Sequence, residues 1–179
     1  MDELMLEAYQ YATAFDGSWQ DEVHLVFSER EKSRYRTRTE RGQELGWFLP
    51  RGIVLCDGDA LLCDNKEMIL IRAASESLTE AYSDDAHLLL RAAYHLGNRH
   101  VSLQILPGAL RFPRDHVLEE MLRGLGLGVR SIDDAFTPES GAYAGVTQEH
   151  AQADPHSHSH SHGHSHGHAP GHSQSDSHR

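Results

Sequence analysis

The pattern of hydrophobic and polar positions changes near residue 75 and divides the chain into two regions. From Asp21 to about Ile71, short apolar runs such as "EVHLVF" and "GWFLPRGIVLC" are separated by Gly, Pro and Asn residues. Short apolar runs between turn-forming residues predict strands joined by tight turns. We therefore expect a small N-terminal β domain over residues 21–74, preceded by an N-terminal extension over residues 1–20.

Two helices are predicted beyond this point, each with an acidic N-cap and a glycine near its end. The first follows Asp84 and stops at Gly97, with helical spacing of Ala86, Leu89, Leu90 and Ala93. The second follows Asp115 and stops at Gly126, with one apolar face formed by Leu118, Met121, Leu122 and Leu125. Spacings of three and four residues between apolar positions indicate amphipathic helices, and the caps set their bounds.

Strands are predicted around these helices. "VSLQI" and "ALRF" flank the turn pair Pro107 and Gly108 and predict a hairpin, and "VRSI" predicts a last strand. From Met68 to Ile132 the order is strand, helix, strand, strand, helix, strand, which is the split βαβ order of ferredoxin-like domains. The predicted fold class is therefore α+β, with a small N-terminal β domain followed by a ferredoxin-like βαββαβ domain over residues 75–144.

Apolar periodicity ends after residue 144, where the chain becomes polar and rich in histidine. A segment with so little apolar surface cannot build a core, so residues 145–179 are expected to form a disordered tail. Eight of its histidines are predicted metal ligands: His156, His158, His160, His162, His164, His166, His168 and His172. Their alternation with Ser and Gly is typical of a natural metal-binding tract. Imidazole suits Ni, Zn and Cu alike, so the tract does not identify its metal.

Charge and composition restrict the partners. The formal net charge is −11 at pH 7, and residues 151–179 contribute only Asp154, Asp176 and Arg179 as fixed side-chain charges. The body of the protein is therefore acidic, which argues against nucleic acid or an anionic membrane as the main partner. No secretory signal or membrane-spanning run is found, and we expect a cytoplasmic protein. Cys56 and Cys63 match neither a CxxC pair nor a disulfide framework.

A local basic stripe interrupts this acidity. Arg34, Arg36 and Arg38 recur with period two in "RYRTR", which places them on one face of a strand. One interpretation is a solvated strand face balanced by nearby glutamates, and the other is a docking surface for a partner.

His100 is the histidine of the body that we single out. Counting by two along "HVSLQI" places it with Ser102 and Gln104, opposite Val101 and Leu103. If the apolar set packs under the helices, His100 faces the uncovered side of the sheet, where a two-fold partner would bring a second His100 opposite the first. A surface or capping histidine is the alternative.

The text "RAAYHLGNRHVSLQI", continued by "DHVLEEMLRGLGLGV" and "FTPESGAY", resembles the C-terminal domain of the UreE family of urease accessory proteins. Upstream, "KSRYRTRTERGQELGWFLPRGIVLCDGDAL" is similar to the N-terminal domain of that family. The resemblance runs from about Asp21 to Tyr143.

This resemblance implies a nickel metallochaperone that delivers Ni(II) to apo-urease during assembly of its metallocentre. It implies a homodimer in which His100 of each subunit binds a shared nickel ion, while the tail adds ligands. Zn(II) and Cu(II) would be competitors, and the partners would be the urease apoprotein complex and the accessory GTPase of urease maturation. Some relatives carry two further histidines around the aspartate of "FPRDHVL", of which only His116 is present here. We leave open whether His116 or His95 is a ligand.

The sequence leaves two other functions open and carries no common catalytic motif. The chain has no GxxxxGK[ST] phosphate loop, no GxSxG elbow and no HExxH motif, so we expect no enzymatic activity. A protein that stores or detoxifies Zn or Cu through its tail is the main alternative. An interaction adaptor that docks through the arginine strand is the third.

Overall fold

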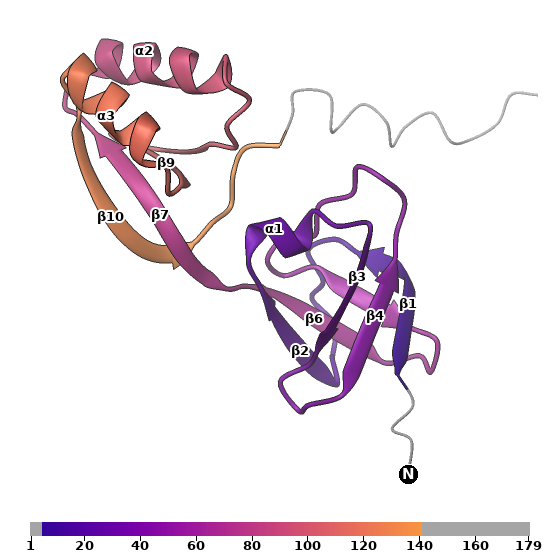
Figure 1. Ribbon diagram of the computed structural model, residues 1–179. Coiled ribbons are helices and arrows are strands. Elements are labelled where there is room, and N and C mark those ends of the chain that lie inside the picture. Colours follow the sequence, from indigo (N-terminus) through magenta and orange to yellow (C-terminus); the bar gives the residue numbers. More distant parts are fainter. Residues whose placement is uncertain (1–4, 141–179) are drawn as a thin grey trace, which may run out of the picture. The chain divides into compact units, whose positions relative to one another are not determined.

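The described part of the chain is a mixed α+β protein with two β-sheets (Figure 1). A computed structural model describes residues 5–140. The predicted tail ligands, His156 to His172, lie outside the described residues. Within residues 5–140, no helix is both long enough and apolar enough to span a membrane.

The first sheet has six strands in the spatial order β2, β6, β5, β1, β4, β3. Their bounds are β1 Leu6–Ala12, β2 Asp21–Leu25, β3 Arg34–Arg38, β4 Glu44–Phe48, β5 Ala60–Cys63 and β6 Met68–Ala73. A one-turn helix, α1 Phe27–Arg30, follows β2. The pairs β1–β4 and β2–β6 are parallel, and the other neighbours are antiparallel.

The expectation of an N-terminal extension over residues 1–20 is wrong for residues 6–12. They form β1, which lies inside the first sheet between β5 and β4. Leu6 and Ala8 on this strand are buried in the same core as Trp47 of β4. The segment is therefore part of the first domain.

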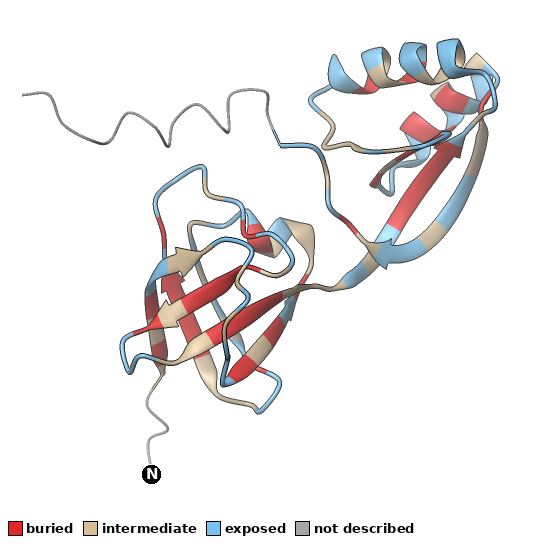
Figure 2. Cartoon of the chain, turned by 180° about the vertical axis from the view of Figure 1, so that it is seen from behind, coloured by how far each residue is buried: buried red, intermediate tan, exposed pale blue. Residues whose placement is uncertain are grey.

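The core of the first domain is built from the inward positions of its strands, seen as buried stretches in Figure 2. Val23, Leu45, Trp47, Leu61, Ile69 and Ile71 are at most 1% exposed. Each large apolar side chain buried in this way contributes about 1.5–3 kcal/mol to folding. The indole of Trp47 also donates a hydrogen bond from Nε1 to the carbonyl of Lys32, at 2.8 Å.

The second sheet has four strands in the order β10, β7, β9, β8, and all neighbours are antiparallel. The elements are β7 Ser75–Tyr82, α2 Ala86–Gly97, β8 Gln104–Leu106, β9 Ala109–Pro113, α3 His116–Leu125 and β10 Gly128–Ala135. The order strand, helix, strand, strand, helix, strand is the one expected. Its first strand is β7, however, because Met68–Ala73 pairs within the first sheet as β6.

Both helices of this domain pack on one face of the second sheet (Figure 1). Ala92 and Leu96 of α2 and Leu122 of α3 share a buried cluster with Ala81 and Phe112 of the strands. Side chains alternate along a strand, so the neighbours of Ala81 on β7, Glu80 and Tyr82, belong to the opposite face.

Candidate metal centre

The helix that leads to His100 is fixed at its start by a capping carboxylate. Asp85 is the N-cap of α2, and its side chain accepts hydrogen bonds from the backbone amides of His87 and Leu88, at 2.8 and 3.3 Å. The sequence predicted Asp84 as the cap, one residue too early. Ala92 and Leu96 on the inner face of the helix are fully buried, which holds α2 against the sheet.

His100 lies in the turn directly after α2, and its backbone has the left-handed conformation that ends the helix. Its φ is +56°, its amide donates to the carbonyl of Gly97 at 2.9 Å, and the amide of Val101 donates to the carbonyl of Leu96 at 3.3 Å. These two bonds around one left-handed residue form a Schellman motif. Val101 packs with Leu96 in the core, which is the apolar contact that accompanies this motif. The helix end therefore fixes the backbone of His100.

The predicted strand placement of His100 is wrong. Residues 101–103 form no strand, and β8 begins at Gln104. Val101 and Leu103 do pack against the core, as expected, but Ile105 is 54% exposed. His100 therefore lies in the turn after α2, and strand alternation does not decide which way its side chain faces.

The His100 side chain is exposed, and within residues 5–140 it makes no hydrogen bond or ion pair. An unengaged, exposed imidazole is available as a ligand. No group of three or more His, Cys, Asp or Glu side chains with metal-binding geometry occurs in the described part of the chain. A metal ion held at His100 thus needs further ligands from outside residues 5–140 of one subunit.

His95 and His116 are the two further histidines that the sequence left open as ligands. His95 is half-buried in the last turn of α2, with its ring against that of Tyr94 at a centroid distance of 5.5 Å. The guanidinium of Arg99 donates to the carbonyl of His95 at 2.9 Å. His116 is exposed and is the first residue of α3, directly after its N-cap Asp115. Neither is placed in a cluster of ligands.

An apolar stripe lies on the outer side of α2. Leu90 is 69% exposed and Tyr94 is 66% exposed, and their spacing of four residues places them on one face of the helix. Large apolar side chains exposed side by side mark an interaction surface more often than isolated ones do. Helical spacing grouped Leu90 with Leu89 and Ala93, which pack against the core, so the spacing did not predict the exposed stripe.

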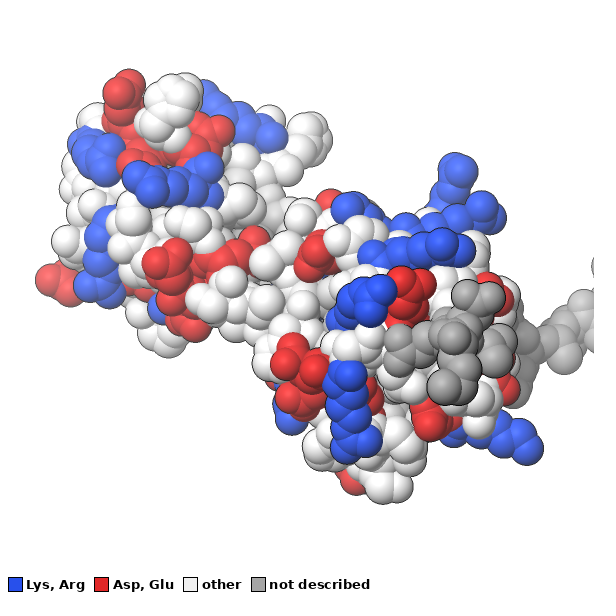
Figure 3. All heavy atoms as spheres, turned by 60° about the horizontal axis from the view of Figure 1, so that its bottom comes forward, with Lys and Arg blue, Asp and Glu red and all other residues white. Residues whose placement is uncertain are grey.

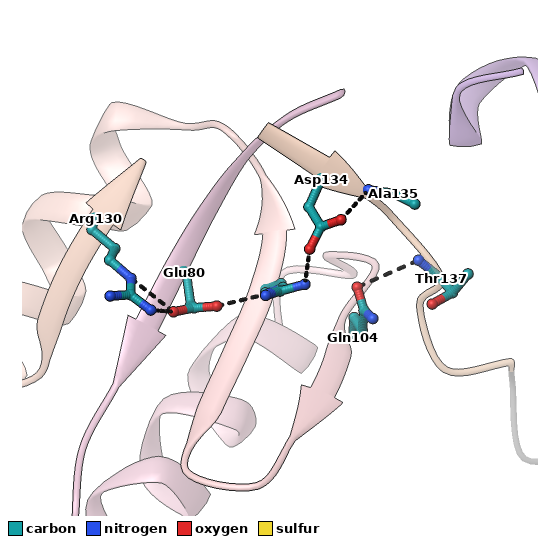
Figure 4. Close-up of polar contacts among 7 residues, drawn as sticks. Glu80, Gln104, Arg130, Asp134, Ala135 and Thr137 are labelled. Atoms are coloured by element: carbon teal, nitrogen blue, oxygen red, sulfur yellow. Dashed lines mark hydrogen bonds and ion pairs between the residues drawn. The ribbon is translucent and has the colours of Figure 1, made fainter. Parts of the chain in front are cut away.

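A charged network lies on the face of the second sheet opposite the helices (Figure 4). Glu80 accepts from Arg111 at 2.8 Å and from Nε of Arg130 at 2.8 Å, and Asp134 accepts from Arg111 at 2.8 Å. Burial raises the pKa of the Glu80 carboxyl, but the hydrogen bonds from Arg111 and Arg130 outweigh this and hold the pKa below its usual range. The network links β10, β7 and β9.

The arginine stripe of the first domain lies on β3, at the edge of its sheet. Arg34, Arg36 and Arg38 are all exposed, as the period of two predicted. Arg38 pairs with Glu44 at 2.7 Å, and Arg34 lies over the ring of Phe48 at 5.8 Å. Figure 3 shows basic and acidic side chains interspersed over the face that it presents, so positive charge occurs there in short clusters.

The two cysteines are both free thiols and form no disulfide with each other. Cys63 is buried in β5, where burial raises the pKa of its thiol to about 12. Cys56 is exposed and free.

Comparison with known proteins connects these features to one family. Residues 5–74 match the model of the UreE urease accessory protein N-terminal domain, and residues 76–176 match that of its C-terminal domain. The chain is 51% identical over 143 residues to the urease accessory protein UreE of Teredinibacter turnerae, covering 79% of this chain and 93% of that protein. It is 49% identical over 146 residues to that of Saccharophagus degradans, covering 80% and 87%.

A third relative is the urease accessory protein UreE of Proteus mirabilis, 50% identical over 121 residues, covering 68% of this chain and 75% of that protein. The matches extend over both sheets, and the relatives share one name. This is a family of accessory proteins in urease maturation and not of enzymes. The chain belongs to the UreE family of urease accessory proteins.

Proposed function

We propose that this protein is a nickel metallochaperone that delivers Ni(II) to apo-urease, with Zn(II) and Cu(II) as competitors for the same ligands. The observation that carries the proposal is the exposed, unengaged imidazole of His100, fixed by the end of α2. Membership of a urease accessory family supplies the biological setting. The second domain, residues 75–144, is assigned to the ferredoxin-like class and is the metal-binding and dimerisation domain in this proposal. We place the protein in the cytoplasm.

A homodimer completes the metal site in this proposal. One imidazole is a poor site for a divalent ion, and within residues 5–140 no group of three or more His, Cys, Asp or Glu side chains could hold a metal ion. The exposed Leu90 and Tyr94 lie on α2, the helix that His100 terminates. An isologous contact that buries this stripe brings the same surface of both subunits together, and with it both His100 residues.

Imidazole ligands suit a carrier that must release its cargo. Neutral imidazole binds Ni(II), and protons compete for it near pH ~6.5, so the complex is labile under mild conditions. A site of few, accessible ligands can pass an ion on by ligand exchange.

The His-rich tail is the collector in this mechanism. Fifteen residues separate Ser140 from His156. A flexible linker of this length spans about 20 Å, so tail histidines can act as intramolecular ligands near the body of the protein. We infer that the tail captures nickel and that His100 is the transfer site.

The N-terminal domain, residues 21–74 together with β1, is the partner-binding domain in this proposal. The arginines on the edge strand β3 offer an exposed, locally positive surface to an acidic partner. The urease apoprotein complex and the accessory GTPase are the partners we propose for it.

Calorimetric nickel titration tests the proposal on three chains: the full protein, the chain ending at Ala144, and His100→Ala. We expect the shortened chain to retain one nickel site shared by the two subunits of the dimer. We expect His100→Ala to retain only the nickel bound by the tail histidines. Urease activity in cells with each variant then tests delivery. If shortening removes all binding and His100→Ala changes neither affinity nor urease activation, the transfer site is refuted.

Storage or detoxification of Zn or Cu is the alternative function, favoured by the many equivalent histidines of the tail. It predicts metal tolerance that falls when the tail is removed, and urease maturation that is indifferent to His100. Excess nickel that restores urease activity in cells lacking the protein would support delivery instead.

A further inference from the structure

The segment that leads into the His-rich tail is fastened at several points, to α1 of the first domain at Phe136 and to the second domain on either side of Phe136. We call residues 134–139 the strap. Beyond Ala135, the end of β10, the strap has no regular secondary structure. A segment of this kind is ordered only by the contacts it makes with its surroundings.

The first half of the strap is held by charge and burial. The carboxylate of Asp134 accepts from Arg111 of β9 at 2.8 Å (Figure 4). Phe136 is fully buried, with its ring edge-on to that of Phe27 at 5.4 Å, and its carbonyl accepts a hydrogen bond from the buried guanidinium of Arg30.

The second half is held by two backbone amides. The amide of Thr137 donates to the side-chain oxygen of Gln104 at 3.4 Å (Figure 4), and the amide of Glu139 donates to the carbonyl of Leu103 at 2.7 Å. Pro138, between them, has a fixed φ and restricts Thr137 to extended conformations. The strap therefore ends bonded to the loop that carries His100, three residues upstream of Leu103.

The order of strands in the second sheet shows how far the strap must run. β10 and β8 are the two edge strands of the second sheet, with β7 and β9 between them. Three inter-strand spacings, about 14 Å in total, therefore separate β10 from β8. Without the strap the tail would begin at the β10 edge, whereas the His100 loop leads directly into β8 at the other edge. Six extended residues reach at most about 20 Å, enough to make this crossing.

We propose that the strap positions the root of the His-rich tail beside the His100 loop, with Gln104, Arg111 and Pro138 as positioning residues. The consequence for metal transfer rests on the proposed function, but the positioning itself does not. Starting the tail close to His100 raises the local concentration of tail imidazoles at the transfer site.

A nickel-free distance measurement tests the positioning. A nitroxide is attached to Ala144→Cys in the full chain carrying Cys56→Ser, because Cys56 is an exposed thiol. We expect the label to broaden the amide signals of residues 98–102. Glu139→Pro removes the amide that bonds Leu103, and broadening should then fall several-fold, since the effect decreases with the sixth power of distance.

Ser140→Pro is the matched control. It introduces the same ring one residue later and leaves the Glu139 amide in place, so broadening should persist. Equal broadening in Glu139→Pro and in the parent would overturn the strap, as would equal loss in both proline variants. Unchanged signals of Leu96 and Phe112 in the core verify that each variant is folded.

A nickel titration then tests the functional consequence. In the full chain, Glu139→Pro should weaken the tightest nickel site about tenfold or more, as expected when a tethered ligand loses its local concentration. When the tail histidines are replaced by serine, Glu139→Pro should change nothing. An equal loss with and without tail histidines would overturn the link between strap and tail. Absence of any nickel site at His100 would refute the proposed function, while the label result would still decide the strap.

Discussion

Replacing His100 with glycine should stabilise the fold and at the same time remove the proposed metal ligand. His100 has a φ of +56° at the position that ends α2. Glycine adopts this left-handed conformation without the steric penalty of a Cβ atom. The two backbone hydrogen bonds of the motif, from His100 to Gly97 and from Val101 to Leu96, do not involve the side chain and should remain.

The magnitude follows from two opposing terms. A left-handed conformation costs a non-glycine residue about 1–2 kcal/mol, which His100→Gly recovers. Glycine also makes the unfolded chain more flexible, which costs about 0.4–1 kcal/mol. The net gain is therefore about 0.5–1 kcal/mol. In a protein of this size it corresponds to a rise in Tm of about 1–4 °C.

Thermal unfolding followed by circular dichroism, without metal, measures this gain. His100→Ala is the matched control, because it removes the imidazole but keeps the Cβ atom. We expect the alanine variant to unfold close to the parent and the glycine variant above both, while both lose the nickel site at residue 100. A glycine variant that unfolds below the parent would show that the imidazole itself stabilises the turn, which would contradict an unengaged ligand.

Three further results are expected. Leu90→Glu combined with Tyr94→Glu should convert the proposed dimer to a monomer in analytical ultracentrifugation, with little change in Tm because both side chains are exposed; a dimer that persists would place the interface elsewhere. Glu80→Gln should flatten the acid side of the stability curve: the folded-state pKa of Glu80 is lowered, so its stabilisation is present at neutral pH and is lost as the pH falls below about 4.5. A Glu80→Gln variant whose urea midpoint falls as steeply as that of the parent between pH 5 and pH 3 would contradict this. Arg36→Glu, on the exposed edge strand β3, should weaken pull-down of the partner GTPase or urease subunits without unfolding the protein; full retention would exclude this part of the strand as the docking surface.

Local signals in the sequence predicted the helices of the second domain well. Asp115 was predicted as an N-cap, and its carboxylate accepts from Val117 and Leu118 at 2.8 and 3.1 Å. Asp84 was preferred to Asp85 because both are capping residues and helical spacing alone does not separate neighbours. In the structure the amide of Asp85 donates to the Ser83 hydroxyl at 3.0 Å.

Features that depend on distant pairing were not predictable in the same way. β1 pairs with β4 and β5, so Leu6 lies opposite Leu45 and Ala12 opposite Ala60. These partners lie 39 and 48 residues away along the chain, and no local pattern around residues 6–12 reports them. The strap was missed for the same reason, because its order comes from contacts with Arg111 and Leu103 and not from periodicity.

His100 shows how a correct candidate can rest on a wrong local structure. Alternation in "HVSLQI" predicted a strand, because Val101 and Leu103 are apolar and do pack inward. The same two contacts are made by a loop after a Schellman motif, which places an apolar residue directly after the left-handed one. A histidine at that position carries a backbone cost that glycine would not. Its exposed imidazole makes no hydrogen bond or ion pair within residues 5–140 that offsets this cost in the folded subunit. Backbone strain that no structural interaction offsets is expected at a residue that serves to bind a ligand. Metal binding is the role proposed for His100.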